Sequence, residues 1–208
     1  MVKISPLPKL PDVQLIQTQR FQDSRGFFME SFRASWLNDH GIDATFCQDN
    51  MSLSVQMGTV RGLHFQYAPH GQGKLVQCLQ GTIWDVAVDI RPDSATFGVW
   101  DAVTLSAEGN EQLYIPPGFA HGFMTLNDNC LVTYKCTAYY KGDAEGAISY
   151  ADPSLAIDWP KMGSAPLLSE KDKAAMSFQE FRTQELRSQE RKTQERKIQN
   201  SSTGAGGS

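Results

Sequence analysis

Most of the chain alternates between short runs of β-branched and aromatic residues and clusters of Gly, Pro, Asp or Asn, which is the pattern of strands joined by turns. Strands are predicted over Val13–Phe21, Gly26–Phe32, Ala44–Val55, Thr59–Gln66, Lys74–Leu79, Thr82–Ile90, Val99–Ser106, Gln112–Ile115, Gly122–Leu126 and Leu131–Tyr140. One further segment, Ala34–His40, predicts a short helix. Many short strands at regular spacing indicate an all-β sandwich or barrel rather than alternating βα units.

Alternation within Thr82–Ile90 predicts a strand with two unlike faces. One face is wholly apolar, whereas the other carries Asp85 and Asp89 between apolar residues. We expect such a strand to be half-buried, with an acidic face that either meets solvent or lines a ligand cavity inside a barrel. The segment Leu131–Tyr140 alternates in a similar way and sets Tyr134 on one side together with apolar residues.

The character of the sequence changes after about Met176. Residues 178–198 are rich in Gln, Glu, Arg and Lys, and residues 200–208 form a Ser/Gly tail. A five-residue echo in this region does not match the period of a coiled coil. We therefore expect one domain over residues 1–178 and a polar tail over residues 179–208, either a solvated helix or a flexible extension without a catalytic role.

Composition and charge restrict the function classes. The 208 residues, of which 40% are hydrophobic, suffice for one domain with a buried core. A formal net charge of −4 offers no bulk positive field, so nucleic acid is not an expected partner. The sequence shows no apolar run long enough to span a bilayer and no signal peptide, so we expect a cytoplasmic protein without membrane contact. Its four cysteines form no CxxC pair and are expected to be buried free thiols.

Two of the four histidines stand in contexts that suggest chemistry. His64 lies in an Arg-Gly-Leu-His-Phe-Gln run, and His121 lies in a Pro-Pro-Gly-Phe-Ala-His-Gly run. His40 ends the predicted helix and His70 lies in a loop, so a surface position accounts for both. The chain has no Gly-x-Ser-x-Gly motif, no Walker phosphate loop and no Gly-x-Gly-x-x-Gly run.

The remaining reactive side chains suit proton transfer next to a carbonyl group. A His can act as a base near neutral pH, and a Tyr on the opposite side of a substrate can return a proton. A Lys near the carbonyl oxygen can stabilise an enolate, and an Asp can orient the His. Residue types alone leave this as one hypothesis among several.

A series of motifs narrows the choice. In chain order they are Phe21-Gln-Asp-Ser-Arg-Gly-Phe-Phe-Met-Glu-Ser-Phe32, Gln48-Asp-Asn-Met-Ser-Leu-Ser54, Arg61-Gly-Leu-His-Phe-Gln66, Gly73-Lys-Leu-Val76, Asp85-Val-Ala-Val-Asp-Ile-Arg91, Ser94-Ala-Thr-Phe-Gly98, Ile115-Pro-Pro-Gly-Phe-Ala-His-Gly-Phe123, Tyr134-Lys-Cys-Thr-Ala-Tyr-Tyr140, Ile157-Asp-Trp-Pro160 and Leu168-Ser-Glu-Lys-Asp172. From about Val13 to Asp172 this series resembles the dTDP-4-dehydrorhamnose 3,5-epimerase family. The resemblance does not extend to the tail after about Met176.

The resemblance implies a fold and a reaction. It implies an all-β cupin jelly-roll barrel with a few short helices, usually a homodimer, with a site inside each barrel and no cofactor. The implied substrate is the nucleotide sugar dTDP-4-dehydro-6-deoxy-D-glucose. Inversion of its carbons 3 and 5 gives dTDP-4-dehydro-L-rhamnose, which leads to dTDP-L-rhamnose.

The resemblance also assigns catalytic roles to four residues. His64 would take protons from the carbons beside the ketone, and Tyr134 would act as the acid on the opposite face. Asp172 would support His64, and Lys74 would stand near the keto oxygen. For Lys74, an ordinary position on the surface of a strand is the alternative.

Further residues are expected to hold the substrate. Arg25, Arg61 and Lys171 would meet the diphosphate, because arginine suits bidentate contact with phosphate. Hydrogen bonds would come from Gln48, Asn50, Glu30 and Glu145, and Asp85 and His121 would form a second pair beside the sugar. Phe27 or Tyr140 would stack on the thymine. Core packing is the alternative for Phe27, and a turn or ion pair with Asp23 is the alternative for Arg25.

A metal site is a rival that the sequence disfavours. His64 and His121 could be two ligands, with Glu108 or Asp85 as the third. A metal-binding cupin normally has a close His-x-His pair, but Gln66 stands where the second His would be, and a neutral amide is a poor transition-metal ligand. We therefore expect no metal and no cofactor.

Three alternatives to the 3,5-epimerase stay open on the sequence. The first is a relative that inverts only carbon 3 or only carbon 5. The second is a metal-dependent cupin oxygenase or isomerase. The third is a cupin that binds a sugar or nucleotide without catalysis, which the presence of His64, Lys74 and Tyr134 together disfavours.

Overall fold

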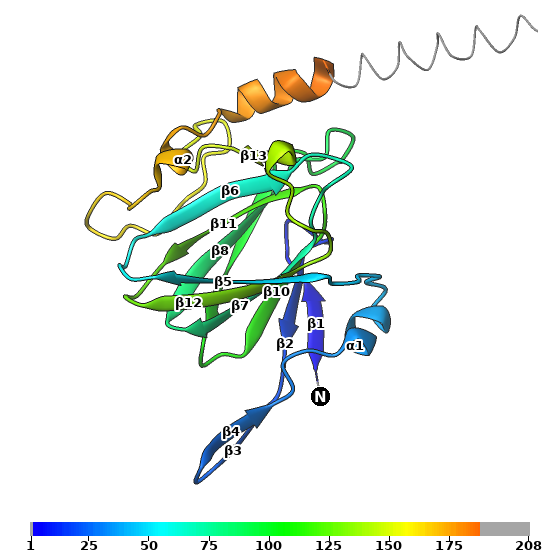
Figure 1. Ribbon diagram of the computed structural model, residues 1–208, viewed down its shortest axis with the longest axis vertical. Helices are drawn as coiled ribbons and strands as arrows, with labels where there is room; N and C mark the ends of the chain where they lie inside the picture. The colour runs from blue at the N-terminus through cyan, green and yellow to red at the C-terminus, as the bar shows by residue number, and fades with distance from the viewer. Residues whose placement is uncertain (1, 188–208) are drawn as a thin grey trace, which may run out of the picture.

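The computed structural model describes residues 2–187 of the chain, and its strands form two large antiparallel sheets and a separate hairpin (Figure 1). The six-stranded sheet has the order β1 (Lys3–Pro6), β2 (Gln14–Gln17), β10 (Glu111–Ile115), β7 (Lys74–Gln80), β12 (Cys130–Cys136), β5 (Gln48–Ser54). The five-stranded sheet has the order β13 (Glu145–Ala147), β6 (Val60–Gln66), β11 (Phe119–Thr125), β8 (Thr82–Asp89), β9 (Trp100–Ser106). The predicted all-β architecture is confirmed.

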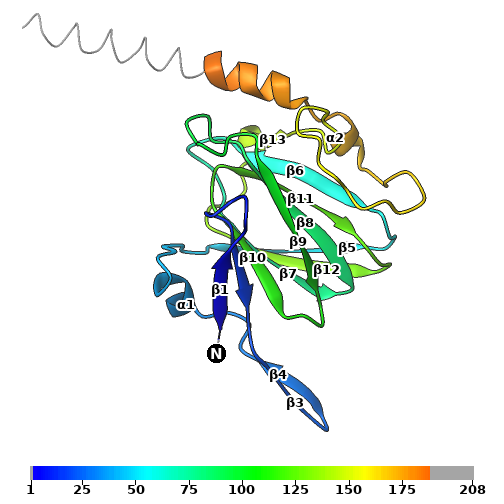
Figure 2. The same ribbon diagram turned by 180° about the vertical axis from the view of Figure 1, so that it is seen from behind.

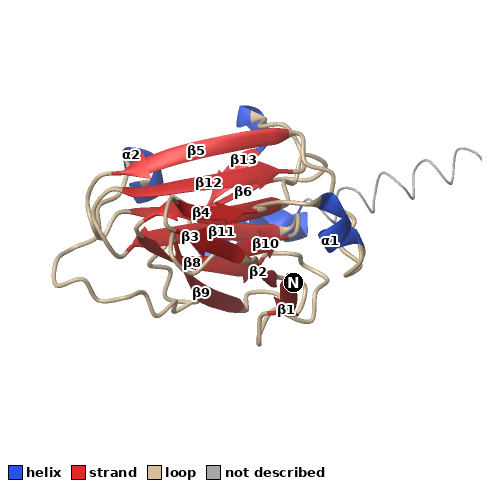
Figure 3. Ribbon diagram, turned by 90° about the horizontal axis from the view of Figure 1, so that it is seen from below, coloured by secondary structure: helices blue, strands red, loops and turns tan. Residues whose placement is uncertain are grey.

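Helices are few and short. They are α1 (Ala34–Asn38), the 3-10 turn η1 (Gly142–Ala144), α2 (Glu170–Lys173) and a helix whose described part covers residues 178–187. Seen from below, they lie around the strands rather than between them (Figure 3). Within the described range, no helix is long and apolar enough to cross a membrane.

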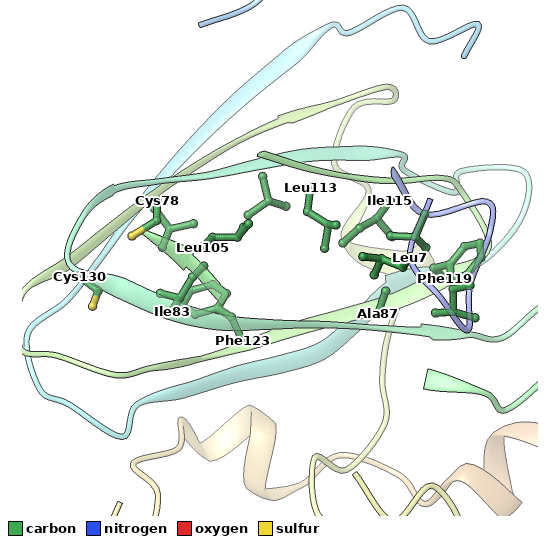
Figure 4. Close-up of a cluster of buried hydrophobic side chains, with 14 residues drawn as sticks. Leu7, Cys78, Ile83, Ala87, Leu105, Leu113, Ile115, Phe119, Phe123 and Cys130 are labelled. Carbon is green, nitrogen blue, oxygen red and sulfur yellow. The ribbon is translucent and has the colours of Figure 1, made fainter. Parts of the chain in front are cut away.

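The main core lies between the two large sheets (Figure 4). Ile83 and Ala87 of β8 point into it from the five-stranded sheet, and Leu113 and Ile115 of β10 meet them from the six-stranded sheet. All four side chains are almost completely removed from solvent. Burial of apolar surface between the sheets is the largest favourable contribution to such a fold.

The outer face of the five-stranded sheet is also covered. Val86 and Val88 of β8 pack there in a second cluster with Phe178 and Phe181. Strand β8 is therefore buried on both faces. The prediction of a half-buried strand, made from its alternation, is wrong. Asp85 is fully buried on the face that points between the sheets, so the acidic face lines the interior of the barrel and not its surface.

Some elements differ from the predicted ones. The segment predicted as one strand over Val13–Phe21 is divided between β2 and β3 (Arg20–Asp23), because only its first part pairs with the six-stranded sheet. Strands β1 and β13 were not expected, since they are only four and three residues long and carry too few alternating positions to be recognised.

The hairpin of β3 and β4 (Gly26–Met29) extends away from the barrel (Figure 1). Its turn ends at Gly26, whose φ of +131° is a conformation that glycine adopts without strain. The view from behind shows the same arrangement, with the hairpin at one end of the molecule and the helix that starts at residue 178 at the other (Figure 2).

The polar region after Met176 begins as an ordered element. Phe178 and Phe181 lie one turn apart in this helix and are 8% and 1% exposed. The ring of Phe181 lies 5.2 Å from that of Phe65 on β6. The expected boundary at residue 178 thus falls at the start of a helix that packs on the sheet, and the rest of the expected tail, residues 188–208, lies outside the described residues.

Candidate active site

A cavity of about 570 Å³ opens between the two sheets. Strand β6 provides Arg61 and His64 on one side, and β7 and β12 provide Lys74 and Tyr134 on the other. A smaller lobe of about 170 Å³ shares His64, Lys74 and Tyr134 with it. The segment from Leu167 to Asp172 closes one side of the cavity.

His64 is oriented by a buried carboxylate. Its Nε2 lies 2.6 Å from Oδ1 of Asp172 on α2, and Asp172 is only 4% exposed. Burial alone would raise the pKa of Asp172, but the hydrogen bonds from His64 and Ser169 outweigh it and hold the pKa below its usual range. The carboxylate is therefore ionised and accepts the proton of Nε2, which leaves the second ring nitrogen of His64 with a free lone pair.

His121 forms a second histidine–carboxylate pair beside the first. It lies directly opposite His64 in the pairing of β11 with β6, and its Nε2 is 2.9 and 3.0 Å from the two carboxylate oxygens of Asp85. Burial lowers the pKa of His121, an effect that the charge of Asp85 partly offsets. The pair is closed off from solvent; His121 lines the inner wall of the cavity, and Asp85 is fully buried behind it.

Two glycines allow β6 and β11 to approach closely at this point. A Cβ atom on Gly62 would lie 2.6 Å from the Cα of Gly122 and from the carbonyl oxygen of His121. No side chain fits within that distance of a backbone. The sequence context Arg-Gly-Leu-His therefore has a structural reason, which is the placement of His64 opposite His121.

Tyr134 and Lys74 face the histidines from the six-stranded sheet. The ammonium nitrogen of Lys74 lies 5.9 Å from the centroid of the Tyr134 ring. Burial raises the pKa of Tyr134, which keeps its phenol protonated and able to donate. Burial also lowers the pKa of Lys74, although Cys136, Asp85 and Glu145 act in the opposite direction.

The smaller lobe is lined by hydrogen-bonding groups. Gln48 and Asn50 of β5 bond to each other at 3.0 Å, and Gln48 also accepts from the backbone N–H of Tyr140 at 2.8 Å. The Tyr140 hydroxyl donates to Glu145 at 2.8 Å, and Glu145 also pairs with Lys171 of α2. This chain of contacts runs from β5 to the helix that carries Asp172.

Four predicted binding residues do not line the cavity or its smaller lobe: Asp85 is fully buried behind His121, and the other three lie outside the barrel. Arg25 and Phe27 lie on the hairpin, where Arg25 pairs with Asp23 at 2.6 Å and Phe27 is 57% exposed. Glu30 follows the hairpin and pairs with Arg33 at 2.8 Å. Within a single chain, Arg25 therefore forms the ion pair with Asp23 that was the alternative to phosphate binding. The alternative for Phe27, core packing, is wrong because Phe27 is exposed.

The structure adds residues that the sequence did not single out. The hydroxyl oxygen of Ser52 is buried at the cavity wall without a hydrogen-bond partner among the described residues. Ser169 caps α2 and bonds to Asp172. A signal for Ser169 was present, because Ser169-Glu-Lys-Asp172 reads as a capping box, whereas nothing in the sequence distinguishes Ser52.

Gln66 has a structural role. Its side-chain nitrogen donates to the carbonyl oxygen of His70 at 2.6 Å, and its oxygen accepts from the backbone N–H of Lys141 at 2.7 Å. It is committed to holding two loops and is 8% exposed. In residues 2–187, no three His, Cys, Asp or Glu side chains come together in a way that would hold a metal ion.

Comparisons with known proteins agree on one family. The family described as dTDP-4-dehydrorhamnose 3,5-epimerase matches residues 8–180. A dTDP-4-dehydrorhamnose 3,5-epimerase of Sinorhizobium fredii is 47% identical over 171 residues, which are 82% of this chain and 87% of that protein.

Solved structures give the same result. The crystal structure of a dTDP-6-deoxy-D-glucose-3,5-epimerase from Legionella pneumophila, in complex with dTDP-4-keto-L-rhamnose, matches with a TM-score of 0.81 and 47% identity, covering 85% of this chain and 93% of that one. A 3'-monoepimerase from Streptomyces bikiniensis in complex with dTDP-quinovose matches with a TM-score of 0.77 and 34% identity, covering 83% of this chain and 86% of that one. The predicted cupin jelly-roll barrel is thereby confirmed, in addition to the all-β class.

Proposed function

The chain belongs to the dTDP-4-dehydrorhamnose 3,5-epimerase family, and from this membership we propose that it inverts carbons 3 and 5 of dTDP-4-dehydro-6-deoxy-D-glucose to give dTDP-4-dehydro-L-rhamnose. One observation carries the proposal. His64 and Tyr134 face a common cavity from opposite sheets, with Lys74 beside Tyr134. A base and an acid on opposite walls are what inversion of a carbon centre requires.

The reaction follows from the acidity of hydrogens next to a ketone. Carbons 3 and 5 both flank the carbonyl at carbon 4, so removal of either proton gives an enolate. The second ring nitrogen of His64 takes the proton, and Asp172 stabilises the imidazolium that forms. The negative charge develops on the carbonyl oxygen, where the ammonium group of Lys74 stabilises it.

Inversion is completed when a proton arrives from the other side. Tyr134 donates the proton of its phenol to the carbon, and the carbon–hydrogen bond forms on the face opposite His64. His64 then loses its proton to solvent and Tyr134 regains one. The raised pKa of Tyr134 favours this return to the phenol, so the site is reset for the second carbon.

The nucleotide part of the substrate extends towards the open side of the site. Arg61 and Lys171 carry positive charge at the cavity wall, where they suit the diphosphate. Tyr140 is 58% exposed at the edge of the smaller lobe, which suits stacking on the thymine ring.

A homodimer accounts for the position of the hairpin. The outward side of β5 exposes Met51 and Leu53, and the hairpin exposes Phe28, a pattern that marks an interaction surface. In a pair of chains, the hairpin of one copy reaches the cavity of the other. Arg25 and Phe27 then contribute to substrate binding from the second copy.

The test is the identity of the product. The protein, with no metal added, is incubated with dTDP-4-dehydro-6-deoxy-D-glucose, and ring coupling constants from proton NMR report the configuration at carbons 3 and 5. We expect wild type to yield the L-lyxo product, and His64→Ala to lose turnover by about 10²-fold or more, because general acid–base catalysis supplies that much per group. His40→Ala is the matched control, because His40 is exposed at the end of α1.

Other outcomes would replace the proposal. Inversion at one carbon only would indicate a single-centre epimerase, like the similar 3'-monoepimerase. Activity that requires a stoichiometric metal would indicate a metal-dependent cupin. Binding of the nucleotide sugar without any conversion would indicate a binding protein.

A further inference from the structure

The second oxygen of Asp172 has a partner of its own. While Oδ1 lies 2.6 Å from Nε2 of His64, Oδ2 accepts a hydrogen bond of 2.7 Å from the hydroxyl of Ser169. The same hydroxyl oxygen accepts the backbone N–H of Asp172 at 3.1 Å. Ser169 therefore holds both the backbone and the side chain of the residue that orients His64.

This arrangement fixes the rotation of the carboxylate. A carboxylate turns easily about its Cβ–Cγ bond unless both oxygens are held. Without Ser169, the carboxylate would keep His64 and the backbone N–H of Gly62 as partners, and His64 is the group whose charge changes when it accepts a proton. The Ser169 hydroxyl carries no charge at any stage, so its hydrogen bond persists while His64 moves between its two states.

The segment that carries Ser169 belongs to the cavity wall. Leu168 and Ser169 line the cavity together with Asp172, and the preceding residue Leu167 pairs with Thr59 in an isolated β-bridge beside β6. The bridge anchors the start of this segment to the strand that bears His64. Ser169 is thus fixed relative to His64 from two sides.

We propose that Ser169 is a positioning residue of the reaction, whose hydroxyl holds the carboxylate of Asp172 in the orientation that His64 requires as a base. This inference rests on the proposed function. Its alternative is that Ser169 only caps α2, a helix of four residues for which it is the N-cap.

Three substitutions of Ser169 separate positioning from capping. Ser169→Ala removes both the cap and the hydroxyl. Ser169→Gly also removes the hydroxyl but weakens an N-cap by only a few tenths of a kcal/mol. Ser169→Thr keeps a hydroxyl that can serve both purposes.

The measurements are kcat and KM for the conversion of the nucleotide sugar, and the thermal midpoint of each variant. Positioning predicts that the Ala and Gly variants both lose about tenfold to a hundredfold in kcat, the range for a hydrogen bond to a charged group, with little change in KM. The Thr variant should recover most of the loss. The thermal midpoint of the Gly variant should stay close to that of wild type.

A matched control exists in the same region. Ser177 caps the next helix in the same way, since its hydroxyl oxygen accepts the backbone N–H of Glu180 at 3.2 Å and its hydroxyl bonds to the Glu180 carboxylate at 2.8 Å. It contacts none of the proposed catalytic residues. Ser177→Ala should therefore leave kcat unchanged.

Two results would overturn the inference. A Gly variant with the kcat of wild type, beside an impaired Ala variant, would leave Ser169 with a capping role only. Full kcat in both variants would remove any role in the reaction. If wild type itself fails to convert the substrate, the proposed function falls, and the inference falls with it, which is a different result from active wild type with unaffected variants.

Discussion

Each polar residue at the cavity is defined by what its side chain contacts. His64 and His121 look alike in sequence, yet His64 is 30% exposed at its side chain and His121 only 8%. Both are paired with a carboxylate, but only His64 combines that pairing with access to the open part of the cavity. This difference is why we assign proton transfer to His64 and a supporting place in the wall to His121.

Tyr134→Phe tests the acid on the opposite wall. The substitution removes the proton donor and leaves His64 and Asp172 in place, so proton abstraction should continue. We expect exchange of the hydrogens at carbons 3 and 5 with solvent to persist, while inversion slows by about 10²-fold or more. Proton NMR in heavy water measures both quantities in one sample, and inversion of both centres at the normal rate would remove Tyr134 from the role of acid.

Sequence patterns located the residues of the site better than they located their partners. His64, Lys74, Tyr134 and Asp172 were singled out from motifs, and the fold brings all four to one cavity; their catalytic roles stay predictions. The sequence does not predict a role for Ser52, because a serine on a strand has no local signature. The sequence predicts Ser169 only as a helix cap. A capping motif indicates which backbone groups are hydrogen-bonded, but it does not show that the Ser169 hydroxyl also bonds to Oδ2 of Asp172.

At the level of elements, alternation predicts that a strand has two faces but not what covers each one. The acidic face of β8 turned out to face inward, with Asp85 on His121. Asp89 ends the strand and has a different task. Its carboxylate accepts hydrogen bonds of 2.6 Å from Ser94 and Thr96 and pairs with Arg91, which fastens the following turn.

Asp89→Asn should reveal this turn as a source of stability that depends on pH. Burial would raise the pKa of Asp89, but the bonds from Arg91, Ser94 and Thr96 lower it to about 2. Since the folded pKa lies below the unfolded one, the stabilisation is complete above about pH 4 and is lost as the pH falls towards 2. The free energy of unfolding in urea at pH 7 should fall by about 2 kcal/mol in the variant.

The same experiment contains its own check. Because wild type loses the contribution of Asp89 in acid, the difference between the two proteins should narrow between about pH 4 and pH 2. A difference that stays constant over this range would show that the charge of Asp89 is not its cause.

The helix that starts at residue 178 shows how a polar pattern can hide a docking contact. Its composition favours solvent, and only the early pair Phe178 and Phe181 is apolar and spaced by one turn. Phe181 packs against Phe65 and Tyr67, and Phe178 packs against Phe97, so this pair docks the first turns on the barrel. The composition of the whole region is dominated by its polar residues, and two phenylalanines change it little. For that reason the sequence predicts a solvated or flexible tail.

Phe181→Ala should lower the free energy of unfolding by about 3 kcal/mol, as expected when a buried Phe is truncated. The ring is 1% exposed, so its removal leaves a cavity beside Phe65 on the strand that bears His64. Leu186→Ala in the same helix is the matched control, because Leu186 is 50% exposed and its loss should change stability by less than about 0.5 kcal/mol. Equal effects of the two substitutions in urea unfolding would contradict the docking of the helix.

For the whole molecule, the central question is whether one chain forms a complete site. Within a single copy, the cavity contains the proposed acid, base and enolate-stabilising groups, whereas Arg25, Phe27 and Glu30 lie apart from it. The exposed aromatic rings of the hairpin and the apolar side of β5 lie outside the barrel. Motifs in a sequence carry no information on which copy of the chain a residue serves, and for that reason these three residues were grouped with the others.

Phe28→Asp tests the proposed pairing of chains. Phe28 is 71% exposed on the hairpin, so a charge there should weaken the association of two chains without disturbing the core of either. Light scattering after size exclusion should give wild type a mass of twice the 23.1 kDa of one chain, and the variant a lower average mass with a raised KM. Leu186→Asp, at the other end of the molecule, should remain paired; a wild type that is a monomer at all concentrations would contradict the homodimer.

The most direct test of the account is solvent exchange at the two carbons that flank the ketone. The protein is mixed with dTDP-4-dehydro-6-deoxy-D-glucose in heavy water without added metal, and proton NMR follows the signals of the hydrogens on carbons 3 and 5. Transfer between His64 and Tyr134 across one cavity predicts deuterium at both carbons together with inversion of both. Absence of exchange at either carbon, even after divalent metals are added, would contradict it.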